Sequence, residues 1–70
     1  SPVLEKFIGN RPVRRAVVET AMATEAPFSA ETLFRHIQKK GSRIGKATIY
    51  RTLKQLCEQK LFQEFSIRGG

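Results

Sequence analysis

The hydrophobic pattern begins with two apolar pairs one helical turn apart, Val3-Leu4 and Phe7-Ile8. This spacing predicts a short helix that ends at Gly9. A second predicted helix covers positions 12–24, because Pro is tolerated in a first turn and apolar or small residues then recur at helical spacing. Its inward stripe consists of Val13, Val17, Thr20, Ala21 and Thr24.

The third predicted helix runs from the cap at Ser29 to about position 40. The hydroxyl of Ser29 can accept from the free amides of the first turn, which makes it a good N-cap. Glu31 suits the positive end of the helix dipole, and Lys39-Lys40 suits the negative end. Gly41 supplies the left-handed residue that ends the helix. The expected buried stripe is Ala30, Leu33, Phe34 and Ile37.

A turn over positions 41–45 leads to a fourth predicted helix, 46–60, with two unlike faces. Its inward stripe is Ile49, Leu53, Leu56 and Cys57. At about 100° per residue the opposite stripe is small at its start, cationic in its middle and amide-bearing near its end. That outward stripe contains Ala47, Thr48, Arg51, Lys54 and Gln55, with Tyr50 at its flank.

The last segment, positions 61–67, alternates apolar and polar residues imperfectly, which favours a strand. Arg68-Gly69-Gly70 then predicts a hairpin turn. A strand without a neighbour leaves unpaired amides and carbonyls, so either the chain is truncated or another chain supplies the second strand. We expect the 70 residues to be a single domain from a longer protein.

Charge narrows the range of partners. Thirteen Lys and Arg against six acidic residues give a net charge of +7. No acidic residue lies between Thr32 and Cys57, although this window holds Arg35, Lys39, Lys40, Arg43, Lys46, Arg51 and Lys54. Like charges repel, so we expect these cations to share a surface, over helices 29–40 and 46–60, that faces a polyanion. Nucleic acid, an anionic membrane surface and an acidic protein are the candidates.

The sequence offers little for catalysis or metal binding. It has one His, one Cys and no Asp. His36 has no carboxylate close in sequence, and Cys57 falls on a buried stripe, so we expect no nucleophile–base set and no enzyme. A tetrahedral metal site needs about four close ligands, and a membrane span needs about 20 apolar residues; neither pattern is present. A single Cys indicates a reducing compartment.

Three helices followed by a strand are the order of a winged helix-turn-helix, whose last helix enters the major groove of DNA. We therefore predict a mostly α fold with a small β wing: a three-helix core, a short N-terminal helix and a wing strand whose hairpin is incomplete. Helix 46–60 would be the recognition helix for double-stranded DNA. Small side chains at its start allow close approach to bases, and Thr48 and Arg51 can contact bases or phosphate. The predicted DNA-binding residues are Lys46, Ala47, Thr48, Tyr50, Arg51, Lys54, Arg43, Arg14 and Arg15.

The stretch IGKATIYRTLKQLCEQKLF, positions 44–62, resembles the signature of the ferric uptake regulator family. The recognition helix of that family begins with a Gly-x-Ala-Thr-Val-Tyr-Arg pattern, which here runs from Gly45 to Arg51 with Ile49 in place of Val. FSAETLF at 28–34 is similar to the start of the family's preceding helix, and RRAVVETA at 14–21 to its first long helix. The closing FSIRGG resembles the family's wing.

The resemblance implies the N-terminal half of a metal-responsive, repressor-type transcription regulator of the bacterial cytoplasm. Tyr50 and Arg51 would contact base edges and backbone, and Arg11 would point toward the minor groove or the backbone. The partner would be a palindromic operator bound by a homodimer. A divalent metal (iron, zinc or manganese) would belong to a second half; we expect no cofactor in this segment. A metal-ligand His that many members carry before the Ser-Ala-Glu start is replaced here by Glu25-Ala26-Pro27-Phe28.

Two other hypotheses stay open. A winged helix can serve as a protein-interaction module, with its basic face against an acidic partner. The chain could also be a small stand-alone repressor without a sensing domain. The salt dependence of DNA binding distinguishes the first alternative from a DNA-binding domain. The residues that follow Gly70 decide the second alternative.

Overall fold

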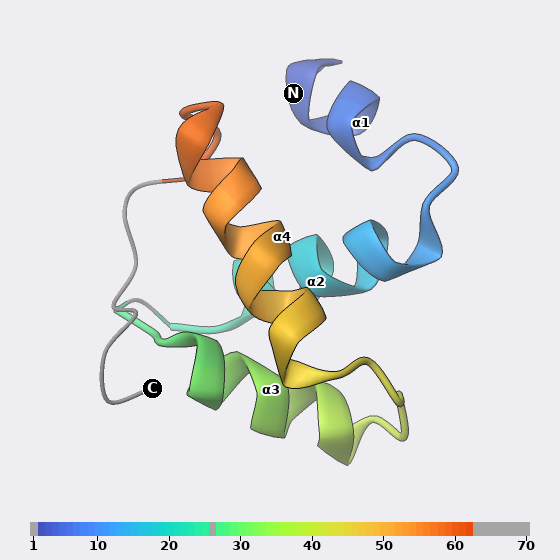
Figure 1. The fold of residues 1–70 in the computed structure, drawn as a ribbon, viewed down its shortest axis with the longest axis vertical. Helices are drawn as coiled ribbons and strands as arrows, with labels where there is room; N and C mark the ends of the chain where they lie inside the picture. The colour runs from blue at the N-terminus through green and yellow to red at the C-terminus, as the bar shows by residue number, and fades with distance from the viewer. Residues whose placement is uncertain (1, 26, 63–70) are drawn as a thin grey trace.

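The computed structural model describes residues 2–25 and 27–62, which form four helices (Figure 1). These are α1 (Pro2–Ile8), α2 (Pro12–Ala23), α3 (Ala30–Lys39) and α4 (Lys46–Glu58). All four helices were predicted from the sequence, each with bounds within two residues of those observed. In Figure 1, α4 runs diagonally across α2 and α3 and packs on both, while α1 packs on α2.

Local signals account for both ends of α3. The Ser29 side chain accepts a hydrogen bond from the Thr32 amide at 3.2 Å, which confirms the predicted N-cap. At the other end, Gly41 has φ = +84°, the left-handed conformation expected of a helix-ending glycine. The Gly41 and Ser42 amides donate to the carbonyls of Gln38 and Ile37, so the last turn is closed.

The core lies where α2, α3 and α4 meet. Its fully buried side chains come from all three helices, and two residues of α1 close one side of it. They are Val17 and Val18 of α2, Leu33 and Ile37 of α3, Ile49, Leu53 and Leu56 of α4, and Phe7 and Ile8 of α1. The inward stripe predicted for the fourth helix is therefore confirmed in its three apolar members.

Some positions were assigned wrongly to the core. Val13 is 39% exposed, because the buried face of α2 begins one turn later, at Val17. Phe34 and Cys57 are half-buried at the edge of the core. Thr52, which the pattern did not single out, is also buried, and its hydroxyl is satisfied there by donating to the Thr48 carbonyl within the helix at 2.8 Å.

After α4 the backbone turns back toward the core. Lys60 has φ = 60°, and the amides of Leu61 and Phe62 both donate to the carbonyl of Leu56. The side chains of Leu61 and Phe62 are half-buried against the core. Leu61 and Phe62 lie in a bend rather than in the strand predicted to begin there. The rest of that predicted strand lies outside the described residues, so the β wing stays a prediction.

Leu53 tests how far the fold depends on the inward stripe of α4. Replacing Leu53, which is 0% exposed, with Ala should lower the free energy of unfolding by about 2–5 kcal/mol, because it leaves a cavity between three helices. Met22→Ala is the control: Met22 is 68% exposed, so a change of about 0.5 kcal/mol or less is expected. Urea denaturation followed by circular dichroism measures both. Equal losses for the two variants would contradict this packing.

Candidate nucleic-acid interface

The outer face of α4 carries the side chains that the sequence placed there. Ala47, Arg51 and Lys54 are exposed, while Thr48, Tyr50 and Gln55 are half-buried. Because Ile49, Leu53 and Leu56 are fully buried on the other side of the helix, this outer face cannot turn toward the core. The orientation predicted for α4 is therefore confirmed; its role in binding DNA stays a prediction.

A hollow runs along one side of this face, between α3 and α4. Its lining comes from the first turn of α3 and the first three turns of α4: Ala30, Glu31, Lys46, Ala47, Tyr50, Arg51 and Lys54. A second hollow lies on the other side of α4, against the α1–α2 connection. It is lined by Asn10, Arg11, Pro12, Val13, Arg14, Thr48, Arg51, Thr52 and Gln55. Arg51 borders both hollows and so occupies the middle of the face.

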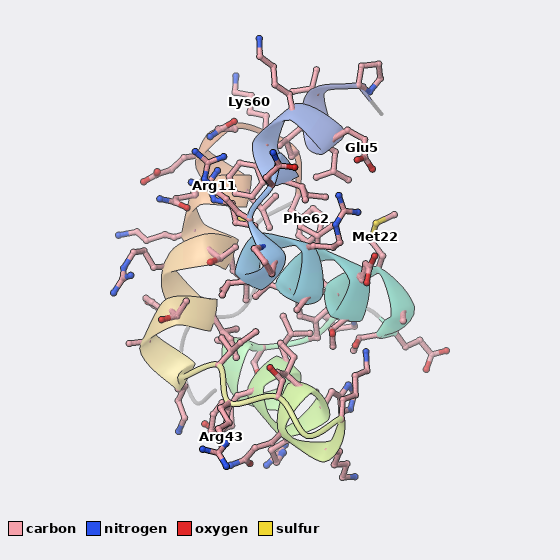
Figure 2. All side chains as sticks on the ribbon, turned by 90° about the vertical axis from the view of Figure 1, so that its right-hand side faces the viewer. Glu5, Arg11, Met22, Arg43, Lys60 and Phe62 are labelled. Carbon is pink, nitrogen blue, oxygen red and sulfur yellow. The ribbon has the colours of Figure 1, made fainter. Side chains whose placement is uncertain are left out.

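Arg11 reaches the second hollow from the α1–α2 connection. Figure 2 shows it beside α4, although the two segments lie far apart in the sequence. Its side chain folds back over Gly9, which has φ = +49°. A Cβ atom at Gly9 would lie 3.1 Å from the Arg11 Nη1 atom, so the guanidinium would have to shift by a few tenths of an ångström, and the positive φ itself favours glycine here. The fold thus brings Arg11 and Arg51 to the same hollow.

Arg14 and Arg15 have contacts with α1 that the sequence did not reveal. The Arg14 Nη1 atom donates to the Phe7 carbonyl at 2.8 Å, and its guanidinium lies 4.2 Å from the centroid of the Phe7 ring. Arg15 lies 3.9 Å from carboxylate oxygens of both Glu5 and Glu19. The contacts of Arg14 with Phe7 and of Arg15 with Glu5 join α1 to α2, whereas the Arg15–Glu19 pair lies within α2. Arg14 therefore has a structural role whether or not it also contacts DNA.

Glu31 is a carboxylate that the sequence did not place at this face. It lies one residue before the acid-free window, in the first turn of α3, and its Oε1 atom is 2.7 Å from Lys46 Nζ. The same Nζ atom lies 5.3 Å from the centroid of the Phe34 ring. The hydrogen bond from Lys46 lowers the pKa of the Glu31 carboxyl below its ordinary value of 4.5. The expected acid-free surface therefore holds one ionised carboxylate near neutral pH.

The cations of the window are also divided between two parts of the molecule, which corrects the expected single surface. Lys39 and Lys40 line a separate hollow between the ends of α2 and α3, together with His36. Lys40 Nζ donates to Thr20 Oγ1 at 3.1 Å, which holds that side chain against α2. Arg43 lies in the α3–α4 connection, at the far end of the molecule from Arg11 in Figure 2. Residues that are close together in the sequence share one surface only where their helices present them on the same side of the molecule.

Within residues 2–25 and 27–62, no cluster of three or more His, Cys, Asp or Glu side chains is placed to hold a metal ion. No helix among these residues is long and apolar enough to cross a membrane.

Residues 10–70 match the family model described as the ferric uptake regulator family, which covers α2, α3 and α4. The chain belongs to the ferric uptake regulator family. Members of this family are regulators rather than enzymes, in line with the absence of a catalytic pattern in the sequence. Searches among curated proteins and among solved structures gave no match. The α4 face and Arg11 both lie inside the matched range, whereas α1 lies before it.

The contacts of Arg14 predict that its side chain stabilises the fold. Arg14→Ala should lower the free energy of unfolding by about 1–2 kcal/mol, because it removes a charged hydrogen bond to Phe7 and a cation–π contact. Arg15→Ala is the matched control, since its long, exposed ion pairs contribute about 0–1 kcal/mol. Thermal unfolding at neutral pH compares the two. A larger loss in Arg15→Ala would refute the anchoring role of Arg14.

Proposed function

We propose that this chain is the N-terminal DNA-binding domain of a repressor-type transcription regulator that acts in metal homeostasis. The observation that carries the proposal is the outer face of α4 in a member of the ferric uptake regulator family. That face has small side chains at its start and an exposed Arg51 in its middle, and it is held outward by a fully buried opposite stripe.

The dimensions of α4 suit the major groove. The helix has 13 residues and is therefore about 20 Å long. The groove is about 12 Å wide and admits one helix, whose N-terminal residues come closest to the base edges. Ala47 and Thr48 occupy this end and leave room for the bases. Arg51, one turn further, would contact a guanine or a phosphate, and Tyr50 would lie against the sugar-phosphate backbone.

The second hollow would hold the DNA backbone next to the groove. Arg11 and Arg51 both line it and come from separate segments, and Thr48 of α4 lines it as well. Guanidinium groups bind phosphate through charge-assisted hydrogen bonds. Arg11 would thus set the register of α4 on the duplex, while Arg51 reads the bases or the adjacent backbone.

Regulation would involve parts of the protein beyond this face. As expected of the family, two copies would occupy a palindromic operator and block transcription. A divalent metal (iron, zinc or manganese) held by a second half would control this binding. A single copy of the domain should bind DNA weakly, because most of its affinity would come from phosphate contacts and only one half-site would be filled.

The proposal predicts salt-dependent binding of double-stranded DNA. In fluorescence anisotropy with a labelled duplex, affinity should fall with a log–log slope of about −0.9 for each phosphate neutralised. Three or four contacts from Arg11, Arg51, Lys54 and Arg43 would give a total slope of roughly −3 to −4. Polyglutamate of matched charge is the comparison. Preference for polyglutamate over duplex DNA would favour the protein-interaction alternative and refute the proposed function.

Arg51 is predicted to be the strongest single contributor on α4. Arg51→Ala should weaken binding about tenfold or more to a duplex that the wild-type chain has selected from a random pool, because a guanine contact contributes about 1–3 kcal/mol. Tyr50→Ala should weaken it in the same direction. Lys39→Ala is the control: it removes the same charge from the separate hollow beside α2 and should change affinity about threefold or less. Equal losses at positions 51 and 39 would exclude α4 as the recognition face.

A further inference from the structure

Glu31 is the only carboxylate that lines the hollow beside the α4 face in the part of the chain that the structure describes. Its side chain is 31% exposed and its Oε1 atom lies 2.7 Å from Lys46 Nζ. Lys46 begins α4 and also lies near the Phe34 ring, so its ammonium is held by a carboxylate and an aromatic face of α3. Two neighbouring cations of the same hollow, Arg51 and Lys54, are exposed.

This position gives the ion pair a consequence for DNA binding. The N-terminus of a helix already attracts phosphate through its free amides and its dipole. A lysine at the first position of α4 would add to this attraction for any duplex, whatever its sequence. Glu31 opposes the contact in two ways: it occupies the ammonium of Lys46, and it would bring a negative charge close to the phosphate.

We propose that Glu31 is a specificity-determining residue that, by holding Lys46, limits the binding of duplex DNA of unrelated sequence. This inference rests on the proposed function, since it concerns the same face of α4. Phosphate contacts raise affinity for every sequence alike, whereas contacts to base edges raise it only for the operator. Removing one cation from the phosphate contacts therefore widens the difference in affinity between operator DNA and random DNA.

Stability alone is a weak explanation for the pair. Exposed ion pairs of this kind contribute little to folding, because solvent screens them and two long side chains must be ordered. The Lys46 side chain is 55% exposed, so the pair is of this screened kind. Its position on the predicted DNA face distinguishes it from the two pairs of Arg15, of which one joins α1 to α2 and the other lies within α2.

The test is Glu31→Gln, measured with a random-sequence duplex between 50 and 200 mM salt. Release of Lys46 should add about 0.9 to the magnitude of the salt slope, so the loss of affinity over this fourfold range becomes roughly 3.5-fold larger than in the wild type. Affinity at the lowest salt should rise about threefold or more. Glu25→Gln makes the same change in net charge in the α2–α3 connection, outside both hollows at α4, and should leave the slope unchanged.

Two further variants assign the effect to Lys46. Adding Lys46→Gln to Glu31→Gln should abolish the gain in affinity, because the released cation is gone. Glu31→Asp keeps the net charge but shortens the carboxylate by one methylene, so its slope should lie between those of the wild type and Glu31→Gln. It also keeps an acidic residue in the first turn of α3, so it provides the test if Glu31→Gln does not fold. Circular dichroism verifies the folding of each variant.

The possible results separate the two proposals. Equal slopes for the wild type and Glu31→Gln, an equal increase in Glu25→Gln, or a gain that persists without Lys46 would each overturn the role of Glu31 and leave the proposed function intact. A wild-type chain that binds no duplex even at the lowest salt would overturn the proposed function, and this inference with it.

Discussion

The burial of one stripe of α4 determines most of what the outer surface presents. Ile49, Leu53 and Leu56 are fully buried, and together they fix the rotation of the helix about its own axis. A helix with a buried stripe of this width has only one remaining direction in which Ala47 and Arg51 can point. The geometry of the outer α4 face is thus a result of core packing, and a change in the core would change this face even where no surface residue is altered.

The short helix α1 extends this arrangement to a second segment. Its residues Phe7 and Ile8 close the core, and Arg14 of α2 binds the Phe7 carbonyl and stacks on its ring. The chain must then turn at Gly9 to enter α2, and this turn places Arg11 beside α4. The contacts of α1 with the core and with Arg14 therefore help to bring a second basic side chain, Arg11, to the hollow that Arg51 also lines.

The helices could be predicted from the sequence because their signals are local. Ser29 and Gly41 act on the turn in which they lie, and the apolar period of α4 identifies its inward side without knowledge of any other helix. Pairings between helices leave no such signal. That Glu31 of α3 meets Lys46 of α4, or that Lys40 reaches Thr20 of α2, depends on how the helices cross. The error at Val13 has the same origin, since the period alone does not show where a neighbour stops covering the stripe.

The charges counted along the sequence and the charges found on the folded surface lead to different expectations for the affinity for polyanions. The window from 32 to 57 has seven cations and no acid, and a surface of that composition would attract polyanions strongly whatever their sequence. In the folded chain Lys39 and Lys40 lie beside α2, and Lys46 is held by Glu31, so fewer cations remain exposed on the α4 face. A regulator must find one operator among many competing sites, and for that task the ratio of specific to unspecific binding matters more than affinity itself. Under the proposed function, a face with Arg51 at its centre and one lysine neutralised at its edge would give a higher ratio of specific to unspecific binding than a uniformly basic face.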